Sequence, residues 1–172
     1  MKNSSLFLKV HPMNKATLAG GCFWGVEELF RTLPGVIKTT VGYTGGQTLN
    51  PTYETVKTGT TGHAEAIQIE FHPEKISYDD ILEFFFRIHD PTTFHRQGND
   101  IGSQYRSEIF CHSQDQKIAA QKAIQQATES GRWQKPIVTK VSDFHEFHSA
   151  ESYHQEYLKK NPGGYTCHFI RD

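Results

Sequence analysis

Residues 20–25 read Gly-Gly-Cys-Phe-Trp-Gly, and this segment restricts the fold more than any other part of the chain. The apolar run before it, residues 16–19, is compatible with a strand. The apolar positions after it, residues 26–30, follow helical spacing. We therefore expect a strand to pass into a helix at this point, with Cys22 at the junction.

Cys22 at such a junction is predicted to be a reactive thiol. The unpaired N–H groups and the macrodipole at a helix N-terminus favour the thiolate, which is the nucleophilic form of cysteine. The rings of Phe23 and Trp24 follow directly and provide an apolar surface beside the sulfur. The segment therefore predicts a nucleophile presented next to an apolar pocket.

The chain has two further cysteines, Cys111 and Cys167. Three cysteines at wide spacing are too few for a disulfide framework, and no Cys-x-x-Cys pair indicates zinc or a thioredoxin-like redox centre. Cys111 ends the apolar run Ile109-Phe110-Cys111, where a small buried side chain is expected. Cys167 lies in a glycine-rich tail, and its local sequence alone leaves its role open.

Length and charge favour one globular domain covering residues 1–172. A formal net charge of -1 with 22% charged residues provides no basic field for nucleic acid. The first apolar run, residues 6–8, is broken by Lys9 and His11 and is too short for a secretory signal, and no stretch approaches a membrane span. We expect a soluble, cytoplasmic monomer with neither nucleic acid nor membrane as a partner.

Hydrophobic periodicity and turn residues predict the remaining elements. Strands are expected at residues 36–43, 66–71, 107–111 and 137–141. A helix is expected from Ser77 to Pro91, and its apolar face contains Ile81, Leu82, Phe85 and Ile88. A second helix is expected from Ser113 to Gly131, and its inner face contains Ile118, Ile124 and Ala127. A third helix is expected over residues 150–158. Ser113 and Gln116 have the spacing of a capping box.

Three connections are long and irregular: residues 45–63, residues 91–106 and everything after residue 159. Long loops in a compact domain are usually functional. We expect an α+β fold, a two-layer sandwich of a mostly antiparallel mixed sheet with helices on one face, wrapped by these loops.

The loops contain further candidates for chemistry. Glu65 follows Gly62-His63-Ala64 at the mouth of a strand, where partial desolvation would favour its acid form, although an edge glutamate facing water is the better reading of this pentapeptide alone. Tyr105, in the polar loop of residues 100–107, is a neutral donor suited to a polarised oxygen, or else a packing residue. Tyr53 lies in the first long loop and carries no signal by itself.

Histidines cluster towards the C-terminus, at His145, His148 and His154, with His168 next to Cys167. The spacing fits no zinc signature, so we interpret these side chains as structural or solvated and expect no metal site.

The separate clusters together resemble one family, peptide methionine sulfoxide reductase type A. The resemblance rests on motifs that occur in the family's order along nearly the whole chain: Gly-Cys-Phe-Trp-Gly at 21–25, Tyr53-Glu54, Gly59-Thr60-Thr61-Gly62-His63-Ala64-Glu65, Asp100-Ile101-Gly102-Ser103-Gln104-Tyr105-Arg106-Ser107, Ala150-Glu151-x-Tyr153-His154-Gln155 and Asn161-Pro162-x-Gly164-Tyr165. It implies the ferredoxin-like α+β fold of that family and reduction of the S epimer of methionine sulfoxide, free or in proteins.

The resemblance also implies a role for each matching residue. Cys22 would be the nucleophile, and Phe23 with Trp24 would form the walls of the pocket for the substrate's S-methyl group. The polar residues that would surround the sulfoxide oxygen are Glu65 as proton donor, Tyr53, Tyr105 and, in the polar lining of the same pocket, Asp100. His63 is a neighbour in the motif to which we assign no chemistry.

The implied cycle uses a second thiol. Cys22 becomes a sulfenic acid, a second cysteine condenses with it to a disulfide, and an external dithiol, thioredoxin, reduces the disulfide. Cys167 is the implied resolving cysteine, although here Thr166 separates it from the Gly-Tyr pair that it directly follows in some members of the family. Cys111 is the alternative. No metal, flavin or nicotinamide cofactor is implied.

Two other classes of function stay open at the level of sequence. Cys22 with His63 or His154 could form the nucleophile and base of an acyl-transfer enzyme. Phe23 and Trp24 could instead bind oxidised methionine or an apolar peptide without turnover. Consumption of dithiol with methionine sulfoxide as sole substrate would exclude acyl transfer, and a Cys22→Ser variant that behaves like its parent in every assay would favour a binding module.

Overall fold

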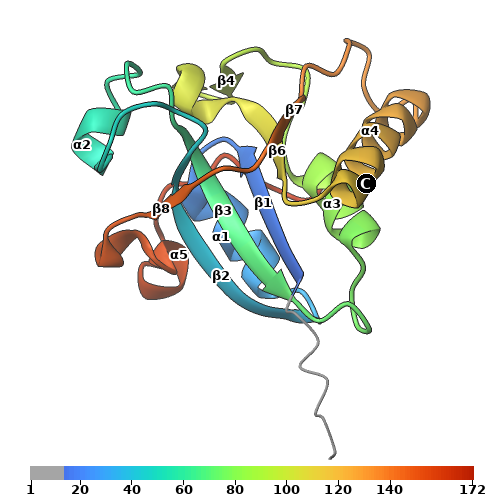
Figure 1. Ribbon diagram of the computed structural model, residues 1–172, viewed down its shortest axis with the longest axis horizontal. Coiled ribbons are helices and arrows are strands. Elements are labelled where there is room, and N and C mark those ends of the chain that lie inside the picture. Colours follow the sequence, from blue (N-terminus) through green and yellow to red (C-terminus); the bar gives the residue numbers. More distant parts are fainter. Residues whose placement is uncertain (1–13) are drawn as a thin grey trace, which may run out of the picture.

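The computed structural model describes residues 14–172, and the apolar run at residues 6–8 lies outside this range. Its centre is a six-stranded sheet with the strand order β7-β6-β1-β3-β2-β8 (Figure 1). The strands are β1 Asn14–Gly20, β2 Val36–Thr44, β3 Ala64–Phe71, β6 Ser107–Cys111, β7 Lys140–Asp143 and β8 Phe147–Ser149. All neighbours pair antiparallel except β6 and β7, which are parallel. The prediction of a mostly antiparallel mixed sheet is confirmed.

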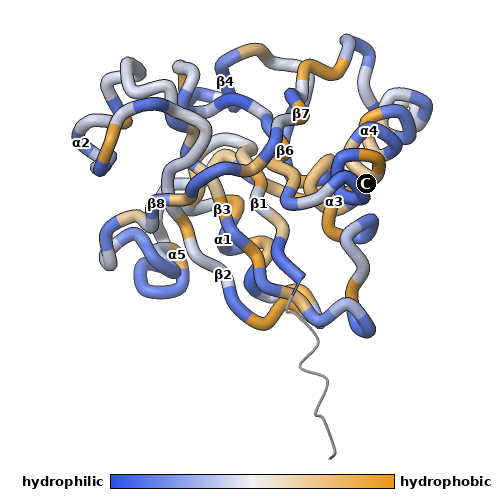
Figure 2. The backbone as a smooth tube through the Cα atoms, in the orientation of Figure 1, coloured by the Kyte–Doolittle hydropathy of each residue, from blue (hydrophilic) through white to orange (hydrophobic). Residues whose placement is uncertain are grey.

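Three helices form the second layer: α1 Phe23–Arg31, α3 Tyr78–Ile88 and α4 Gln114–Glu129. They bury one face of the sheet in a core that includes Leu18, Ile67, Ile69 and Ile109. Figure 2 shows hydrophobic residues concentrated on the central strands and on the sides of the helices turned towards them, with mostly hydrophilic outer loops. The helices therefore lie on one face, as the sequence predicted.

The opposite face is covered by the connection between β7 and β8, with Phe144 from the connection and Phe147 from the start of β8 packed against it. Only residues 144–146 separate these strands, although β7 and β8 form the two edges of the sheet. A chain of this length spans at most roughly 14 Å, so the two edges must approach each other here. The sheet is thus strongly curled, and the connection crosses it as a strap (Figure 1).

Most predicted elements are confirmed, with small differences at their ends. The predicted strand at residues 137–141 is wrong in its bounds, because β7 begins at Lys140, where the chain becomes parallel to β6. The predicted inner face of α4 is also partly wrong. Ile118 is 56% exposed, whereas Ala120, Ala123 and Ala127 are buried, because small side chains let α4 approach α3 closely.

Two predictions about helix ends need correction. Ser113 caps α4 by accepting a hydrogen bond from the Gln116 N–H at 3.1 Å, but the Gln116 side chain accepts from the His112 N–H rather than completing a capping box. The single helix predicted at residues 150–158 is instead a 3-10 turn, η2 Ser152–His154, and a short helix, α5 Tyr157–Lys160. Glu156 separates them with a φ of 50°, which a helix cannot contain.

The long loops also contain short elements that periodicity did not predict. These are α2 Tyr53–Val56, β4 Arg96–Gln97 paired with β5 Asp100–Ile101, and the 3-10 turn η1 Ser103–Tyr105. None of the helices described has both the length and the apolar character that a membrane crossing requires.

The capping box of α3 gives a test of local stability. The Ser77 hydroxyl accepts from the Asp80 N–H at 3.0 Å, and the Asp80 carboxylate accepts from the Ser77 N–H at 3.0 Å. Ser77→Ala removes the first bond and should lower the free energy of unfolding by about 1 kcal/mol. Chemical denaturation measures this loss. Thr128→Ala, at an exposed position inside α4, is the control, and equal stabilities of the Ser77 variant and its parent would contradict the prediction.

Candidate active site

The strand pairing brings distant parts of the chain to one end of the sheet. Because β1 runs antiparallel to both neighbours, its last residue, Gly20, lies at the end where β3 and β6 begin. Cys22 follows β1 by two residues, Glu65 is the second residue of β3, and Tyr105 precedes β6 by two residues. Three of the predicted site residues therefore meet although they are far apart in sequence.

Cys22 is the N-cap residue of α1, so the predicted passage from strand to helix is confirmed. Its side chain is only 8% exposed. Burial is the main cause that raises the pKa of the Cys22 thiol well above its ordinary value, and the negative charge of Glu65 adds to it, while a hydrogen bond from the Trp24 N–H acts in the opposite direction. The effect of the helix N-terminus, which the sequence predicted to favour the thiolate, is therefore not enough to lower the pKa of Cys22. Desolvation outweighs the helix.

Glu65 is buried at 3% exposure and points to the start of α1. Its Oε1 accepts a hydrogen bond from the Phe23 N–H at 3.4 Å. Burial raises the pKa of Glu65 to about 8, and the charge of Asp100 adds to this. The reading as a solvent-facing edge glutamate is thus wrong, because β3 is a central strand. At neutral pH the site holds a neutral acid beside a neutral thiol.

Two tyrosines face this pair. Burial and then the charges of Glu65 and Cys22 raise the pKa of Tyr53, which begins α2. Burial and then Glu65, Asp100 and Cys22 raise the pKa of Tyr105. Both hydroxyls are therefore neutral hydrogen-bond donors at physiological pH. The charges of Cys22 and Glu65 thus influence the pKa values of both tyrosines that the sequence analysis predicted for the site.

Aromatic packing holds the side chains that follow Cys22. The Trp24 ring stacks on Tyr157 with ring centroids 3.8 Å apart, and its Nε1–H donates to His154 Nδ1 at 2.9 Å. His154 also packs on Phe23, at 5.1 Å, and on Tyr53, at 4.8 Å, between ring centroids. The two predicted pocket residues and one of the predicted tyrosines thus share a single histidine as their support.

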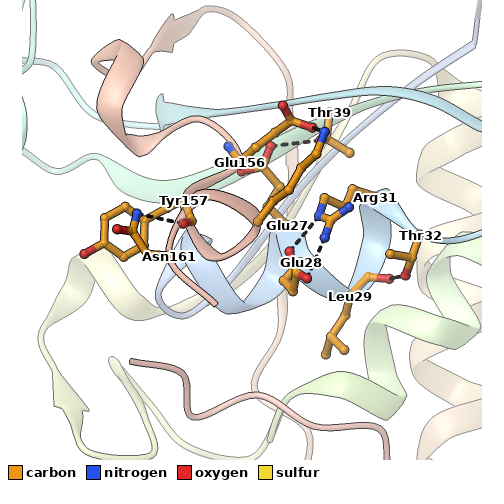
Figure 3. A network of polar contacts seen from close by, with 10 residues as sticks. Glu27, Glu28, Leu29, Arg31, Thr32, Thr39, Glu156, Tyr157 and Asn161 are labelled. Carbon is orange, nitrogen blue, oxygen red and sulfur yellow. Dashed lines mark hydrogen bonds and ion pairs between the residues drawn. The ribbon is translucent and has the colours of Figure 1, made fainter. Parts of the chain in front are cut away.

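A buried carboxylate on α1 fixes the turn that carries this histidine. Glu27 accepts from the Thr39 hydroxyl at 2.8 Å and from the Glu156 N–H at 2.9 Å, which connects α1 to β2 and to the turn between η2 and α5 (Figure 3). That turn carries His154 on one side and Tyr157 on the other. Glu27 therefore stabilises the backbone on which both partners of Trp24 depend.

Glu151 fixes the backbone at Tyr53 in the same way, by accepting hydrogen bonds with its carboxylate. Its carboxylate accepts from the Tyr43 hydroxyl at 2.8 Å and from the Tyr53 N–H at 3.0 Å. Tyr43 pairs with Glu65 across β2 and β3. The start of α2 is thus fixed relative to the strands.

The C-terminal tail lies against the same end of the sheet. Asp100 Oδ2 accepts from the Tyr165 hydroxyl at 3.1 Å and lies 3.8 Å from Cys167 Sγ. Burial and the charge of Asp100 raise the pKa of Cys167, and the charge of Cys167 is in turn among the influences on Cys22. Asp100 therefore contacts the tail in this structure, and the tail brings a second thiol to the site.

Cys111 is located elsewhere. It is 4% exposed in the core under the helices, four residues along β6 from Ser107, which pairs with Gly20. Four residues of strand correspond to about 13 Å. The expectation that Cys111 is buried is confirmed.

Four residues that support the site were not predicted as parts of it: Glu27, Glu151 and Tyr157 were assigned no role, and His154 was interpreted as a structural or solvated histidine or as the base of an acyl-transfer enzyme. Glu151 and His154 belong to a motif that carried the resemblance, and this was the available signal. His63 is buried, and its ring bonds the backbone of the first long loop through the Gly46 N–H at 3.0 Å and the Thr48 carbonyl at 2.8 Å. No group of side chains among residues 14–172 has the arrangement of a metal site.

A groove of about 590 Å³ is bordered by Arg31, by residues 36–40 and by Ser149, Ala150, Ser152, Gln155 and Glu156. It contains none of the predicted site residues. The candidate site is therefore identified by the convergence of thiol, acid and phenols, and not by this groove.

This chain is similar to known proteins over most of its length. Residues 14–172 match the family model of peptide methionine sulfoxide reductase. The peptide methionine sulfoxide reductase MsrA of Methanothermobacter thermautotrophicus is 53% identical over 157 residues, which cover 91% of this chain and 92% of that protein.

Solved structures give the same result. Mxr1 from Saccharomyces cerevisiae in its reduced form is similar with a TM-score of 0.88 at 38% identity, covering 92% of each chain. Mxr1 in complex with Trx2 is similar with a TM-score of 0.63 at 26% identity, covering 92% of this chain and 90% of that chain.

The raised pKa of Glu65 predicts how stability changes with pH. Between its ordinary pKa of 4.5 and about 8, the folded protein holds a proton that the unfolded chain has lost. The contribution of this carboxyl to stability must therefore fall as pH rises through that window. Relative to Glu65→Gln, the parent should lose on the order of a few kcal/mol of unfolding free energy between pH 5 and pH 8.

Urea denaturation of the two proteins at several pH values measures this difference. Glu74→Gln, at an exposed position after β3, controls for the loss of one carboxyl group. Stability curves of the parent and Glu65→Gln that stay parallel across the window would show that Glu65 is not held neutral.

Proposed function

This chain belongs to the peptide methionine sulfoxide reductase A family and reduces peptide methionine (S)-S-oxide to methionine, and we propose that Cys22 carries out this reaction with Glu65 as the acid. The observation that supports this assignment is the meeting of a buried thiol and a buried carboxyl at one end of the sheet, where burial raises the pKa of both groups and the charge of Glu65 raises the pKa of Cys22 further. A neutral acid next to a sulfur nucleophile is suited to removing oxygen from a sulfoxide.

In the first step, Cys22 Sγ attacks the sulfoxide sulfur while the Glu65 carboxyl gives its proton to the sulfoxide oxygen. The Tyr53 and Tyr105 hydroxyls donate hydrogen bonds to the same oxygen as its charge grows. Glu65 regains a proton from the thiol. The protonated oxygen passes from the substrate sulfur to Cys22 Sγ, its bond to the substrate sulfur breaks and methionine leaves, so thiol and sulfoxide become sulfenic acid and methionine with no net proton change. The thiol is neutral in the free site, and we propose that it ionises only as the substrate oxygen accepts the acid's proton.

Phe23 and Trp24 form the apolar side of this site in the proposal. This role is supported by the contacts that hold the two rings in place. Trp24 stacks on Tyr157 and donates a hydrogen bond to His154, and Phe23 packs on the same imidazole. Rigid apolar walls favour the substrate's methyl group without competing for the oxygen. Asp100 contributes to the polar rim opposite them.

In the second step, the Cys167 thiol attacks the Cys22 sulfenic acid, a disulfide forms, and water leaves. The support is the docking of the tail through Tyr165 on Asp100, which holds Cys167 at the site, whereas Cys111 is buried in the core.

A thioredoxin is the proposed reductant, since the similar protein Mxr1 forms a complex with Trx2. Thiol, acid and resolving thiol come from one chain, so a monomer suffices. The cycle fits the cytoplasm, where thiols are kept reduced.

The alternative of a Cys–His acyl transferase lacks a free base. The ring nitrogens of His63 are both occupied by backbone groups, and His154 Nδ1 accepts the Trp24 N–H. Because Nδ1 of His154 accepts, Nε2 carries the hydrogen of the neutral ring, so neither imidazole has a lone pair free for the proton of Cys22. Sulfoxide reduction needs no such base.

Substituting the two cysteines separately tests the cycle. Cys22→Ser should produce no methionine. Cys167→Ser should produce about one methionine per enzyme in a single turnover and then stop, because its sulfenic acid has no internal thiol to react with. Quantifying methionine released from the S sulfoxide with a thioredoxin system measures both outcomes.

Cys111→Ser is the matched control and should cycle like the parent. If Cys167→Ser turns over repeatedly with thioredoxin, the resolving assignment is wrong. If Cys22→Ser retains turnover, the nucleophile is wrong.

Glu65→Gln keeps a hydrogen-bond donor but has no transferable proton. The rate of methionine formation in the first turnover should fall by a factor on the order of 10² to 10⁴. The parent should also lose kcat/KM as pH rises through about 8, where the Glu65 carboxyl ionises, and the variant should lack this limb of the profile. An unchanged rate would reduce Glu65 to a positioning residue.

A further inference from the structure

The tail is anchored on both sides of Cys167. Upstream, the Tyr165 hydroxyl donates to Asp100 at 3.1 Å. Downstream, His168 Nε2 lies 2.7 Å from the Gly20 carbonyl oxygen. The Arg171 N–H donates to the Arg87 carbonyl at 2.8 Å, and the Arg87 side chain donates from Nε to the Arg171 carbonyl at 3.0 Å. His168 is buried, while Phe169 and Ile170 beside it are exposed. A histidine is thus the inward-facing residue next to the second thiol.

The hydrogen-bond partner of Nε2 determines the tautomer of His168. A carbonyl oxygen only accepts, so Nε2 must carry the hydrogen. In the neutral ring, Nδ1 then has a free lone pair and acts as an acceptor. Burial lowers the pKa of His168 to about 4, and the nearby positive charge of Arg171 acts in the same direction, so the ring is neutral at physiological pH. His89 is the other titratable group whose charge interacts with this ring.

The free lone pair points at the sulfur of Cys167. Nδ1 lies 3.8 Å from Cys167 Sγ, which is within hydrogen-bond distance for a thiol, and it has no other hydrogen bond within residues 14–172. Two further acceptors lie 3.8 Å from the sulfur, the Gln97 carbonyl and Asp100 Oδ2. The carbonyl is not a base. The Asp100 oxygen can accept a second hydrogen bond, but it shares its lone pairs with the Tyr165 hydroxyl. Nδ1 of His168 is the nitrogen base whose lone pair has no other hydrogen-bond partner among residues 14–172.

The same ring also lies beside the nucleophile's loop. A Cβ atom at Gly25 would overlap His168 Nδ1 and the Thr166 hydroxyl, and a Cβ at Gly21 would come within 3.1 Å of Nε2. Gly21 and Gly25 flank Cys22 in sequence. The absence of side chains at these two positions lets the imidazole lie between the tail and the start of α1.

We propose that His168 is a catalytic residue of the second step, the base that takes the proton of the Cys167 thiol as it attacks the Cys22 sulfenic acid. This inference rests on the proposed resolving role of Cys167. The Cys167 S–H bond breaks as the S–S bond forms, Nδ1 holds the proton, and the proton then joins the hydroxide leaving Cys22 to give water. The imidazole ends neutral, and no further reactant is consumed.

His168→Gln separates this role from the anchoring role. The glutamine amide can still donate to the Gly20 carbonyl from the position of Nε2, but it offers no basic nitrogen at the position of Nδ1. In rapid-quench single turnovers without reductant, we expect methionine formation to stay within about twofold of the parent and disulfide formation to slow by a factor on the order of 10². The slowed disulfide step should also become dependent on pH, rising as solvent takes over deprotonation of Cys167.

His145→Gln, an exposed histidine between β7 and β8, is the matched control and should form the disulfide at the parental rate. Mass spectrometry of the quenched samples counts sulfenic acid and disulfide separately. Disulfide formation in His168→Gln at the parental rate and with the parental pH profile would overturn the proposal. Equal slowing of methionine formation and disulfide formation would overturn it too, because it would assign His168 to holding Gly20 and Cys22 in place.

A second measurement uses the unaltered protein and so does not depend on the folding of the variant. Nitrogen-15 NMR of the reduced protein should show His168 protonated at Nε2 and unprotonated at Nδ1. The opposite tautomer would overturn the proposal even if the variant is slow. If the parent itself does not form the Cys22–Cys167 disulfide, the proposed resolving step is refuted. If only the role of His168 is wrong, the parent still forms this disulfide, so the two failures can be distinguished.

Discussion

The antiparallel pairing of β1 with both β3 and β6 is the constraint on which the rest of the structure depends. It brings the end of one strand to the beginnings of two others, so that the residue after β1 and those at the starts of β3 and β6 share one end of the sheet. Cys22, Glu65 and Tyr105 are each within two residues of such a strand end. A parallel arrangement would leave these groups at opposite ends of the sheet.

This location has an electrostatic consequence. The end of a central strand under a helix is poorly solvated, and there the charged form of any side chain is disfavoured. For Cys22 and Glu65 this acts in the same direction, because each anion would also repel the other. The helix N-terminus, which by itself would favour a thiolate, is too weak to reverse it. Cys22 and Glu65 are therefore both neutral at rest, and in the proposed mechanism Cys22 ionises only when the substrate's oxygen is present to accept a proton.

Periodicity and capping signals predicted β2, β3, β6, α1 and α3 well, because each buries one face against the same core and so shows its pattern in sequence. They failed for residues 150–158, where the turn at Glu156 depends on Glu27, a residue on α1 far away in sequence. The site residues likewise divide into those with a local sequence signal and those that depend on contacts far away in sequence. Cys22 could be selected from its own flanks, but Glu65 looked like an ordinary edge residue until β3 was known to be central. The support of Trp24 by His154 and Tyr157 is a long-range contact that no local pattern contains.

The same burial explains how a reactive cysteine can persist between turnovers. Oxidants that are not substrates react with thiolates much faster than with thiols, so a protonated Cys22 is oxidised only slowly by them. Cys167 is likewise held with a raised pKa, and in the neutral state its proton has acceptors close by. A site in which neither thiol is ionised at rest needs proton acceptors that act only during the reaction. In the proposed mechanism, the Glu65 carboxylate accepts the proton of Cys22 once the substrate's oxygen has taken the proton of this acid, and the tail must provide a separate acceptor for Cys167.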